Sequence, residues 1–228
     1  KVLKKKLFKI AIIGLGNIGS YLYEYLNKNK NILTSRNNVN YKIVYISAKN
    51  KNKKRKIKFK KKIWVKNYLD ITKKKDVDII IELIGGADGH AKKLVFSAIN
   101  NGKHVVTANK ALISKHGDEL SKLAESKGVN LEYEAAVCGG VPIIRSIKEG
   151  LIANKINKIF GIFNGTSNYI LSSMDTEKSN FNDTLNKAKN LGYSEANPKS
   201  DLNGDDVAAK VKILSALSFN SYINNNIH

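Results

Sequence analysis

Hydrophobic and polar positions in the first part of the chain follow two periods. Short apolar runs bounded by glycine or polar residues predict strands, and apolar residues three or four positions apart predict helices. The predicted strands are 9–13, 41–47, 63–65, 77–83, 104–108 and 130–134, and the predicted helices are 19–26, 91–100 and 113–127. Because strands and helices alternate, this pattern predicts an α/β fold with a doubly wound parallel sheet that ends near residue 133.

The second part has a different pattern. Apolar spacing predicts helices over 141–151, 168–174, 181–191 and 205–219, with one strand over 156–163. Pro142 lies in the first turn of the first of these helices, where proline is tolerated. We therefore expect two domains, residues 1–133 and residues 134–228, and the second is expected to mix helices with strands as a partial α+β domain.

The first predicted strand runs directly into a glycine-rich turn. Between a strand and a helix, the first glycine permits the tight turn, the second lets backbone approach a pyrophosphate, and the third lets the helix pack on the strand. The helix start also offers unpaired N–H groups and a positive dipole end to phosphates. The motif predicts a dinucleotide bound in a Rossmann-type domain by Gly14, Gly16, Asn17, Ile18 and Gly19.

The residues after the second predicted strand indicate which dinucleotide is bound. An NAD enzyme usually places Asp or Glu there to bind the ribose 2′-hydroxyl, but no acidic residue occurs between Glu24 and Asp70. Ser47 and Lys49, with Arg55 as a further candidate, can instead hold a 2′-phosphate through charge-assisted hydrogen bonds. NADP is therefore the expected cofactor, with NAD as the alternative.

The net charge of +21 raises the question of nucleic-acid binding. Residues 49–66 contain eleven Lys or Arg and no acid. However, this stretch has one Phe and one Trp, and no zinc-ligand or aromatic-platform pattern. Lys, Asn and Ile are also frequent throughout the chain, so we interpret most of the excess as compositional drift on solvated surface.

Composition limits the other protein classes. A hydrophobic content of 42% with two prolines is typical of a globular protein, and no apolar run approaches the roughly 20 residues that span a bilayer. The single cysteine, Cys138, fits a reducing compartment, so we expect a cytoplasmic protein without a membrane partner. The chain starts without Met and ends in a polar tail, which is typical of a fragment.

A charged cluster within residues 191–210 is the strongest candidate for chemistry. Glu195, Asp201, Asp205, Asp206 and Lys210 surround a loop that leads into the predicted helix over 205–219. Asp206 and Lys210 are four positions apart and so share a helix face. This spacing fits a surface ion pair. It also fits a partly buried site for a substrate with an ammonium, a carboxylate and a carbonyl group, which we favour.

Three other segments have candidate roles. Thr107-Ala-Asn-Lys110 follows a strand at the carboxyl edge of the sheet, where Lys110 can polarise a carbonyl or relay a proton. The segment 134–142 has small residues whose carbonyls can bind a monovalent cation, or it is a tight hinge between domains. Asn164-Gly-Thr-Ser-Asn168 is either a helix cap or a set of donors to a substrate.

Together these motifs resemble one enzyme family. GLGNIG, TANK, EAAVCGGVPI, GIFNGTSNYIL and LGYSEANPKSDLNGDDVAAK are similar to homoserine dehydrogenase and occur in the same order as in that family. The first motif is shared by many dehydrogenases, whereas the last two are nearly diagnostic. The resemblance implies reversible reduction of L-aspartate 4-semialdehyde to L-homoserine with NADPH or NADH, on the route to threonine, methionine and isoleucine.

The resemblance also implies a role for each matching residue. Glu195 and Asp206 would bind the substrate amino group, and Lys210 would donate or accept the proton at the carbonyl oxygen. Lys110 would lie beside the nicotinamide and assist orientation or proton transfer. Family members are usually dimers through the second domain's sheet, so a homodimer is expected.

A cation site follows from the same resemblance. A sodium-like ion would be bound, mostly through backbone oxygens, by Glu134, Val137, Gly139 and Val141.

The sequence departs from the family in two places. Catalytic domains of this family continue beyond the helix over 205–219, so the second domain is expected to be incomplete at its C-terminus. The basic stretch after Ser47 also replaces shorter segments of typical members. The alternatives are a fragment that only binds nucleotide, another small-substrate NADP oxidoreductase, and a basic nucleic-acid-binding protein.

Overall fold

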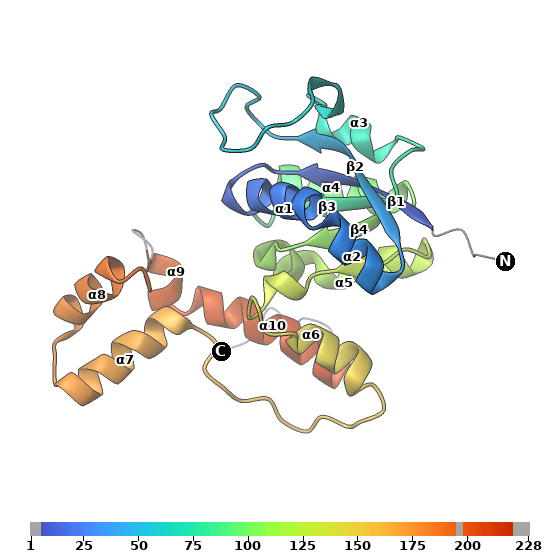
Figure 1. Cartoon of the computed structure of the whole chain (residues 1–228). Helices are drawn as coiled ribbons and strands as arrows, with labels where there is room; N and C mark the ends of the chain where they lie inside the picture. The colour runs from blue at the N-terminus through green and yellow to red at the C-terminus, as the bar shows by residue number, and fades with distance from the viewer. Residues whose placement is uncertain (1–5, 195–197, 221–228) are drawn as a thin grey trace. The chain divides into compact units, whose positions relative to one another are not determined.

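The computed structural model describes residues 6–194 and 198–220, and the chain divides into two units, residues 1–139 and 140–228. Five parallel strands form the sheet of the first unit, in the order β2-β1-β3-β4-β5 (Figure 1). They are β1 (Leu7–Ile13), β2 (Asn40–Ser47), β3 (Ile79–Glu82), β4 (His104–Thr107) and β5 (Leu131–Glu132). The predicted parallel sheet is confirmed, with small differences at the strand ends.

The short strand predicted over 63–65 is wrong. Lys61–Ile63 form a 3₁₀ turn, and Trp64 pairs with Ile46 through an isolated parallel bridge. The lysines on both sides of this bridge are exposed, because water solvates their charges better than a sheet edge would. Since β1 occupies the other edge of β2, Trp64 still marks the place of the third strand in a Rossmann-type order.

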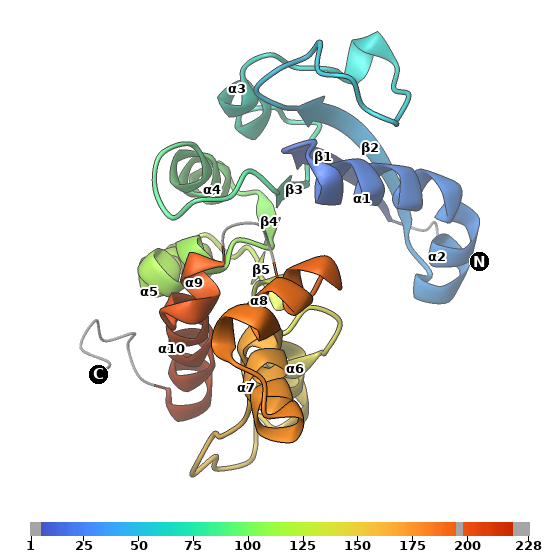
Figure 2. The same ribbon diagram turned by 90° about the vertical axis from the view of Figure 1, so that its left-hand side faces the viewer.

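Helices cover both faces of this sheet. Figure 2 shows α1 and α2 on one side and α4 and α5 on the other, as the doubly wound prediction requires. The strands between them contain consecutive fully buried residues, including Ala11 and Ile12, as is usual for a sheet covered on both faces. The helices of the first unit are α1 (Asn17–Lys28), α2 (Lys30–Asn37), α3 (Tyr68–Thr72), α4 (His90–Asn100) and α5 (Lys110–Ser126).

In the second unit, all regular structure among the described residues is helical. The strand predicted over 156–163 is therefore wrong. A strand needs a partner for its backbone groups, and the described part of this unit contains no second strand. Phe160 and Ile162 of this segment are 83% and 75% exposed. The helices are α6 (Ile143–Arg145), which continues as a π-turn over Ser146–Gly150, α7 (Gly165–Glu177), α8 (Phe181–Asn190), α9 (Lys199–Leu202) and α10 (Asp205–Phe219).

Candidate active site

The glycine turn lies where the strand order of the sheet reverses. The chain passes from β1 to β2 on one side and returns to β3 on the other, and ligands of such sheets bind beyond the carboxyl ends of the strands at this point. A cleft of about 670 Å³ opens here, lined by the turn, the loop after β2, the end of β3 and the starts of α3 and α4.

A different physical reason favours glycine at each of the three positions of the turn. Gly14 has a φ of +103°, and a Cβ there would lie 2.3 Å from the carbonyl oxygen of Leu83. A Cβ on Gly19 would lie 1.9 Å from the carbonyl oxygen of Gly14. By contrast, a Cβ on Gly16 would meet no atom within 4 Å and would project into open space. The turn therefore fits a dinucleotide, because Gly16 leaves room for a pyrophosphate at the start of α1.

Asn17 and Ile18 start α1 beside this open space. Asn17 is the first residue of the helix, and the Ile18 side chain is 64% exposed. The first turn of α1, Asn-Ile-Gly-Ser, carries neutral side chains only, so its N–H groups and dipole act on an anion without a competing carboxylate.

Ser47 and Lys49 both line the cleft, as the cofactor prediction requires. Ser47 ends β2 and is 2% exposed, and its carbonyl accepts a hydrogen bond from Gly14 N at 2.9 Å. Lys49 lies just beyond and is exposed. Of the described residues that line this cleft, four are Lys or Arg and none is Asp or Glu.

Arg55 mainly stabilises the loop after β2. Its guanidinium stacks on Trp64 at 5.7 Å and donates four hydrogen bonds to backbone carbonyls. Nε binds Leu15 O at 3.1 Å, Nη1 binds Lys51 O at 3.3 Å and Lys53 O at 3.1 Å, and Nη2 binds Asn50 O at 2.7 Å. These bonds use most of its donors, so its suggested contact with a 2′-phosphate is secondary to this structural role.

Glu82, at the end of β3, was missed by the sequence analysis. Its side chain is fully buried, and its carboxylate accepts hydrogen bonds from Ile84 N at 2.6 Å, Gly85 N at 3.0 Å and Thr107 Oγ1 at 2.5 Å. These bonds hold the loop after β3, which includes the cleft-lining Ile84, against the end of β4. The signal that could have revealed it is a single acid at the end of an otherwise apolar strand.

Lys110 is the first residue of α5, at the same edge of the sheet. Asn109 caps this helix: its Oδ1 accepts from Leu112 N at 3.1 Å and its Nδ2 donates to Gly86 O at 2.7 Å. A cation is unfavourable at a helix N-terminus, where the dipole is positive. Lys110 thus lies where the helix dipole disfavours a positive charge.

In the second unit, α10 brings Asp206 and Lys210 together. Lys210 Nζ lies 2.7 Å from Asp206 Oδ2 and donates to Phe163 O at 2.6 Å. The Asp206 side chain is only 11% exposed, and the Lys210 side chain is 17% exposed. The two side chains therefore form a partly buried ion pair and not an exposed surface pair. Glu195, the other predicted substrate ligand, lies outside the described residues.

Two neighbours complete this cluster. Asn164 Nδ2 donates to Asp201 Oδ1 and to Asp206 Oδ2, each at 2.9 Å. Thr166 Oγ1 lies 3.2 Å from Asp201 Oδ2 and 2.7 Å from Tyr193 O. The segment 164–168 therefore caps α7, which confirms the first of its two alternatives, and it also contacts the acidic cluster.

Two protein-family models match the chain, one in each part of it. Residues 14–134 match the family model described as "Homoserine dehydrogenase, NAD binding domain", and residues 142–226 match the model described as "Homoserine dehydrogenase". The chain belongs to the homoserine dehydrogenase family. The resemblance inferred from its motifs is thereby confirmed.

Individual homoserine dehydrogenases show the extent of the match. The chain is 50% identical to that of Neisseria gonorrhoeae over 161 residues, which is 71% of this chain and 37% of that protein. It is 42% identical to that of Pseudomonas aeruginosa over 214 residues, which is 94% of this chain and 49% of that protein. The chain thus spans about half, or less, of the length of these relatives.

Solved structures of homoserine dehydrogenases have the same fold. The structure from Thiobacillus denitrificans has a TM-score of 0.86 and 39% identity, covering 97% of this chain and 51% of that one. A structure from S. aureus at pH 7.5 has a TM-score of 0.82 and 38% identity, covering 97% and 52% of the two chains. The predicted Rossmann-type α/β fold is confirmed.

The cation site suggested by the homoserine dehydrogenase resemblance falls on a tight backbone segment. Glu134 starts a 3₁₀ turn (Glu134–Ala136), Val137 is fully buried, and Gly139 ends the first unit, whereas Val141 belongs to the second. Between them, Cys138 has a φ of +50°. Within the described residues, no group of three or more His, Cys, Asp or Glu side chains could hold a metal ion, so a site here depends on backbone oxygens.

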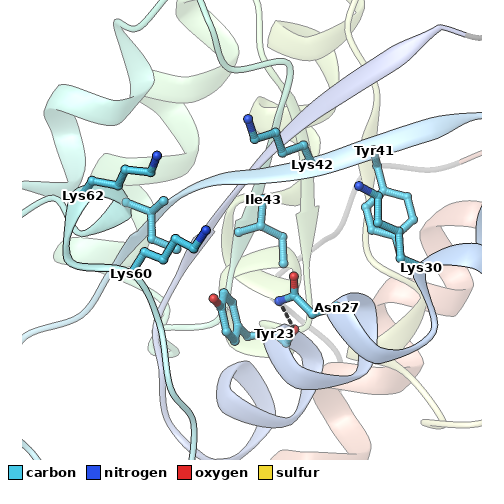
Figure 3. Close-up of a pocket in the computed structure, with 9 residues that line it drawn as sticks. Tyr23, Asn27, Lys30, Tyr41, Lys42, Ile43, Lys60 and Lys62 are labelled. Atoms are coloured by element: carbon cyan, nitrogen blue, oxygen red, sulfur yellow. Dashed lines mark hydrogen bonds between the residues drawn. The ribbon is translucent and has the colours of Figure 1, made fainter.

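The basic stretch lines two separate hollows of the first unit. Lys49, Lys53 and Lys66 face the cleft, while Lys60 and Lys62 reach a second hollow of about 260 Å³ beside α1 and β2 (Figure 3). In this hollow Asn27 Nδ2 donates to Tyr23 O at 2.8 Å, and the hydroxyl of the buried Tyr41 donates to Leu26 O at 2.6 Å. Its four lysines are exposed.

A membrane-spanning role has no support in the described part of the chain. None of the helices there is both long enough and apolar enough to cross a bilayer.

Proposed function

We propose that the protein containing this chain interconverts L-homoserine and L-aspartate 4-semialdehyde with a nicotinamide cofactor. Family membership and the cleft at the glycine turn support this function. The observation that carries it is the partly buried Asp206–Lys210 pair, which joins an acid suited to a substrate ammonium and a base suited to a substrate hydroxyl. The reaction would serve the synthesis of threonine, methionine and isoleucine.

Lys210 has the central chemical role in this proposal. In the direction of reduction, its ammonium donates a proton to the carbonyl oxygen as negative charge develops there, and in oxidation its amine accepts the hydroxyl proton. The bound nicotinamide supplies or receives the hydride. Asp206, together with Glu195, binds the substrate ammonium and holds the reacting carbon in place. Lys110 assists orientation or proton transfer from the first unit.

The decisive test of this function is turnover with L-homoserine. It is followed by the near-ultraviolet absorbance of the reduced cofactor, with NADP and with NAD. Both this chain and a form extended to the length of its relatives are assayed. We expect homoserine-dependent reduction of NADP by the extended form. If neither form turns over homoserine while both still bind cofactor, the protein binds nucleotide but does not have this activity.

We also propose that NADP is preferred. The absence of carboxylates among the described lining residues and the position of Lys49 beside Ser47 support a 2′-phosphate site. We expect Lys49→Glu to lower the NADP to NAD ratio of kcat/KM by about 10- to 100-fold, because a charge-assisted bond is replaced by repulsion.

Lys51→Glu is the matched control for Lys49→Glu. It makes the same charge change in the same loop, but the Lys51 side chain does not line the cleft. An equal effect of both substitutions would show that the general charge of the loop, and not a bond from Lys49, sets the preference.

Two further properties are proposed from the family resemblance. A monovalent cation such as sodium binds mostly through backbone oxygens of Glu134, Val137, Gly139 and Val141, and the extended protein forms a homodimer. Turnover in sodium compared with tetramethylammonium salts tests the cation. Light scattering coupled to gel filtration tests the dimer.

A further inference from the structure

Asn164 joins the two halves of the acidic cluster through one amide group. It is 6% exposed and caps α7, where its Oδ1 accepts a hydrogen bond from Ser167 N at 2.8 Å. Its Nδ2 donates to Asp201 Oδ1 and Asp206 Oδ2, both at 2.9 Å. An amide nitrogen has two N–H donors, so each carboxylate takes one.

The Asn164 amide reduces the repulsion between two neighbouring carboxylates. Asp201 and Asp206 each lie within hydrogen-bond distance of the same nitrogen, and two carboxylates this close repel each other where water is partly excluded. A neutral donor between them satisfies both without adding a charge. Aspartate at position 164 would keep the helix cap and the size of the side chain, but it would place a third carboxylate there.

Two of the bonds to Asp206 share one oxygen. Asn164 Nδ2 and Lys210 Nζ both approach Asp206 Oδ2, at 2.9 Å and 2.7 Å. The second bond of Lys210 goes to the carbonyl of Phe163, the residue immediately before Asn164. The same short segment therefore fixes both the acid and the base, and the carboxylate cannot rotate without losing one of its donors.

We propose that Asn164 is a positioning residue for recognition of the substrate's primary ammonium. It holds the Asp206 carboxylate in the orientation that lets Asp206 bind the ammonium while Lys210 stays at the reacting oxygen. This inference rests on the proposed function and adds to it a residue that acts through Asp206 and makes no contact of its own with the reacting atoms.

A purely structural role as a helix cap is the competing explanation, and the chain contains a matched example. Asn180 caps α8 in the same way, with Oδ1 accepting from Asp183 N at 3.0 Å and Nδ2 donating to Asp183 Oδ2 at 2.6 Å. Both of these hydrogen bonds lie within the first turn of its own helix. The amide of Asn164 instead reaches residues 37 and 42 positions away.

The first test uses Asn164→Ser and Asn180→Ser in the extended protein. Serine preserves a capping oxygen in both but removes the Nδ2 donors. For Asn164→Ser we expect the KM for L-homoserine to rise about 10- to 100-fold, the loss of a hydrogen bond to a charged group, with an unchanged KM for NADP. Asn180→Ser should leave both constants unchanged. A homoserine KM within twofold of the unmodified value in Asn164→Ser would overturn the proposal.

The second test separates substrate positioning from attachment of the Asp201 loop. Asn164→Asp alone should raise the KM for homoserine and lower the melting temperature. Adding Asp201→Asn restores a donor and an acceptor between positions 164 and 201, so the melting temperature should recover. The bond to Asp206 is still missing, so the KM should stay high. Recovery of the KM together with the melting temperature would show that Asn164 only anchors the loop.

A crystal structure of the Asn164→Ser chain gives a readout that does not depend on activity. We expect the Asp206 carboxylate to turn away from its present contact with Lys210 Nζ. An unchanged Asp206 side chain in that crystal would overturn the positioning role. Absence of homoserine turnover in the unmodified extended protein would refute the proposed function instead, and the crystal would still show whether Asn164 orients the Asp206 carboxylate.

Discussion

Replacement of Lys210 by methionine is expected to lower kcat for homoserine oxidation by about 10²- to 10⁴-fold, the usual contribution of a positioned acid or base. Methionine keeps an unbranched apolar stem, so packing along α10 is largely retained. It removes the ammonium that lies 2.7 Å from Asp206 and 2.6 Å from the Phe163 carbonyl. Steady-state kinetics should show this loss while the dissociation constant for NADPH, measured by fluorescence titration, remains unchanged.

Lys212→Met is the control for this experiment. Lys212 lies on the same helix two residues further on, which places it on a different face of α10 from Lys210. It should retain normal turnover. A Lys210→Met protein with normal kcat would remove Lys210 from the chemistry, and loss of NADPH binding would indicate a general folding defect rather than a missing proton donor.

The second large effect is expected at the glycine turn. Gly14→Ala should destabilise the first unit and abolish cofactor binding, because a Cβ would overlap the Leu83 carbonyl and because the φ of +103° is strained for any side chain. A loss of about 1–3 kcal/mol is expected from the backbone strain alone. Thermal unfolding of the chain and NADPH titration measure the two consequences.

Gly16→Ala should separate these two consequences. A Cβ at position 16 meets no atom of the protein within 4 Å, so the melting temperature should hardly change. Cofactor binding should still weaken strongly, because the methyl group enters the space assigned to the pyrophosphate. Normal NADPH binding by Gly16→Ala would mean that the cofactor does not approach this turn.

The sheet could be predicted from sequence because its strands are buried on both faces. Continuous apolar runs such as residues 79–81 have few alternatives in a chain that alternates strands and helices. The failures occurred where local pattern and environment disagree. The helix α2 (Lys30–Asn37) has no buried residue, so no apolar periodicity predicted it. The segment 156–163 has strand-like residues, but its structure depends on a partner that local sequence does not specify.

The candidate site was predictable only in part, for a related reason. Asp206 and Lys210 are four residues apart on one helix, so their proximity follows from helical geometry. Asn164 contacts Asp206 across 42 residues, and Glu82 contacts Thr107 across 25. Such contacts arise from tertiary packing, and a single sequence carries no periodicity that reports them.

The way Arg55 holds the loop after β2 has an evolutionary consequence. All four of its hydrogen bonds go to backbone carbonyls, one in the glycine turn and three in the loop itself. The carbonyls that Arg55 binds are present whatever side chains those positions carry. Selection can therefore exchange many of these side chains while Arg55 keeps the loop in place, so a lineage drifting toward lysine could retain an ancestral binding geometry, and many members of a laboratory library randomised at 51, 53 and 54 should remain folded.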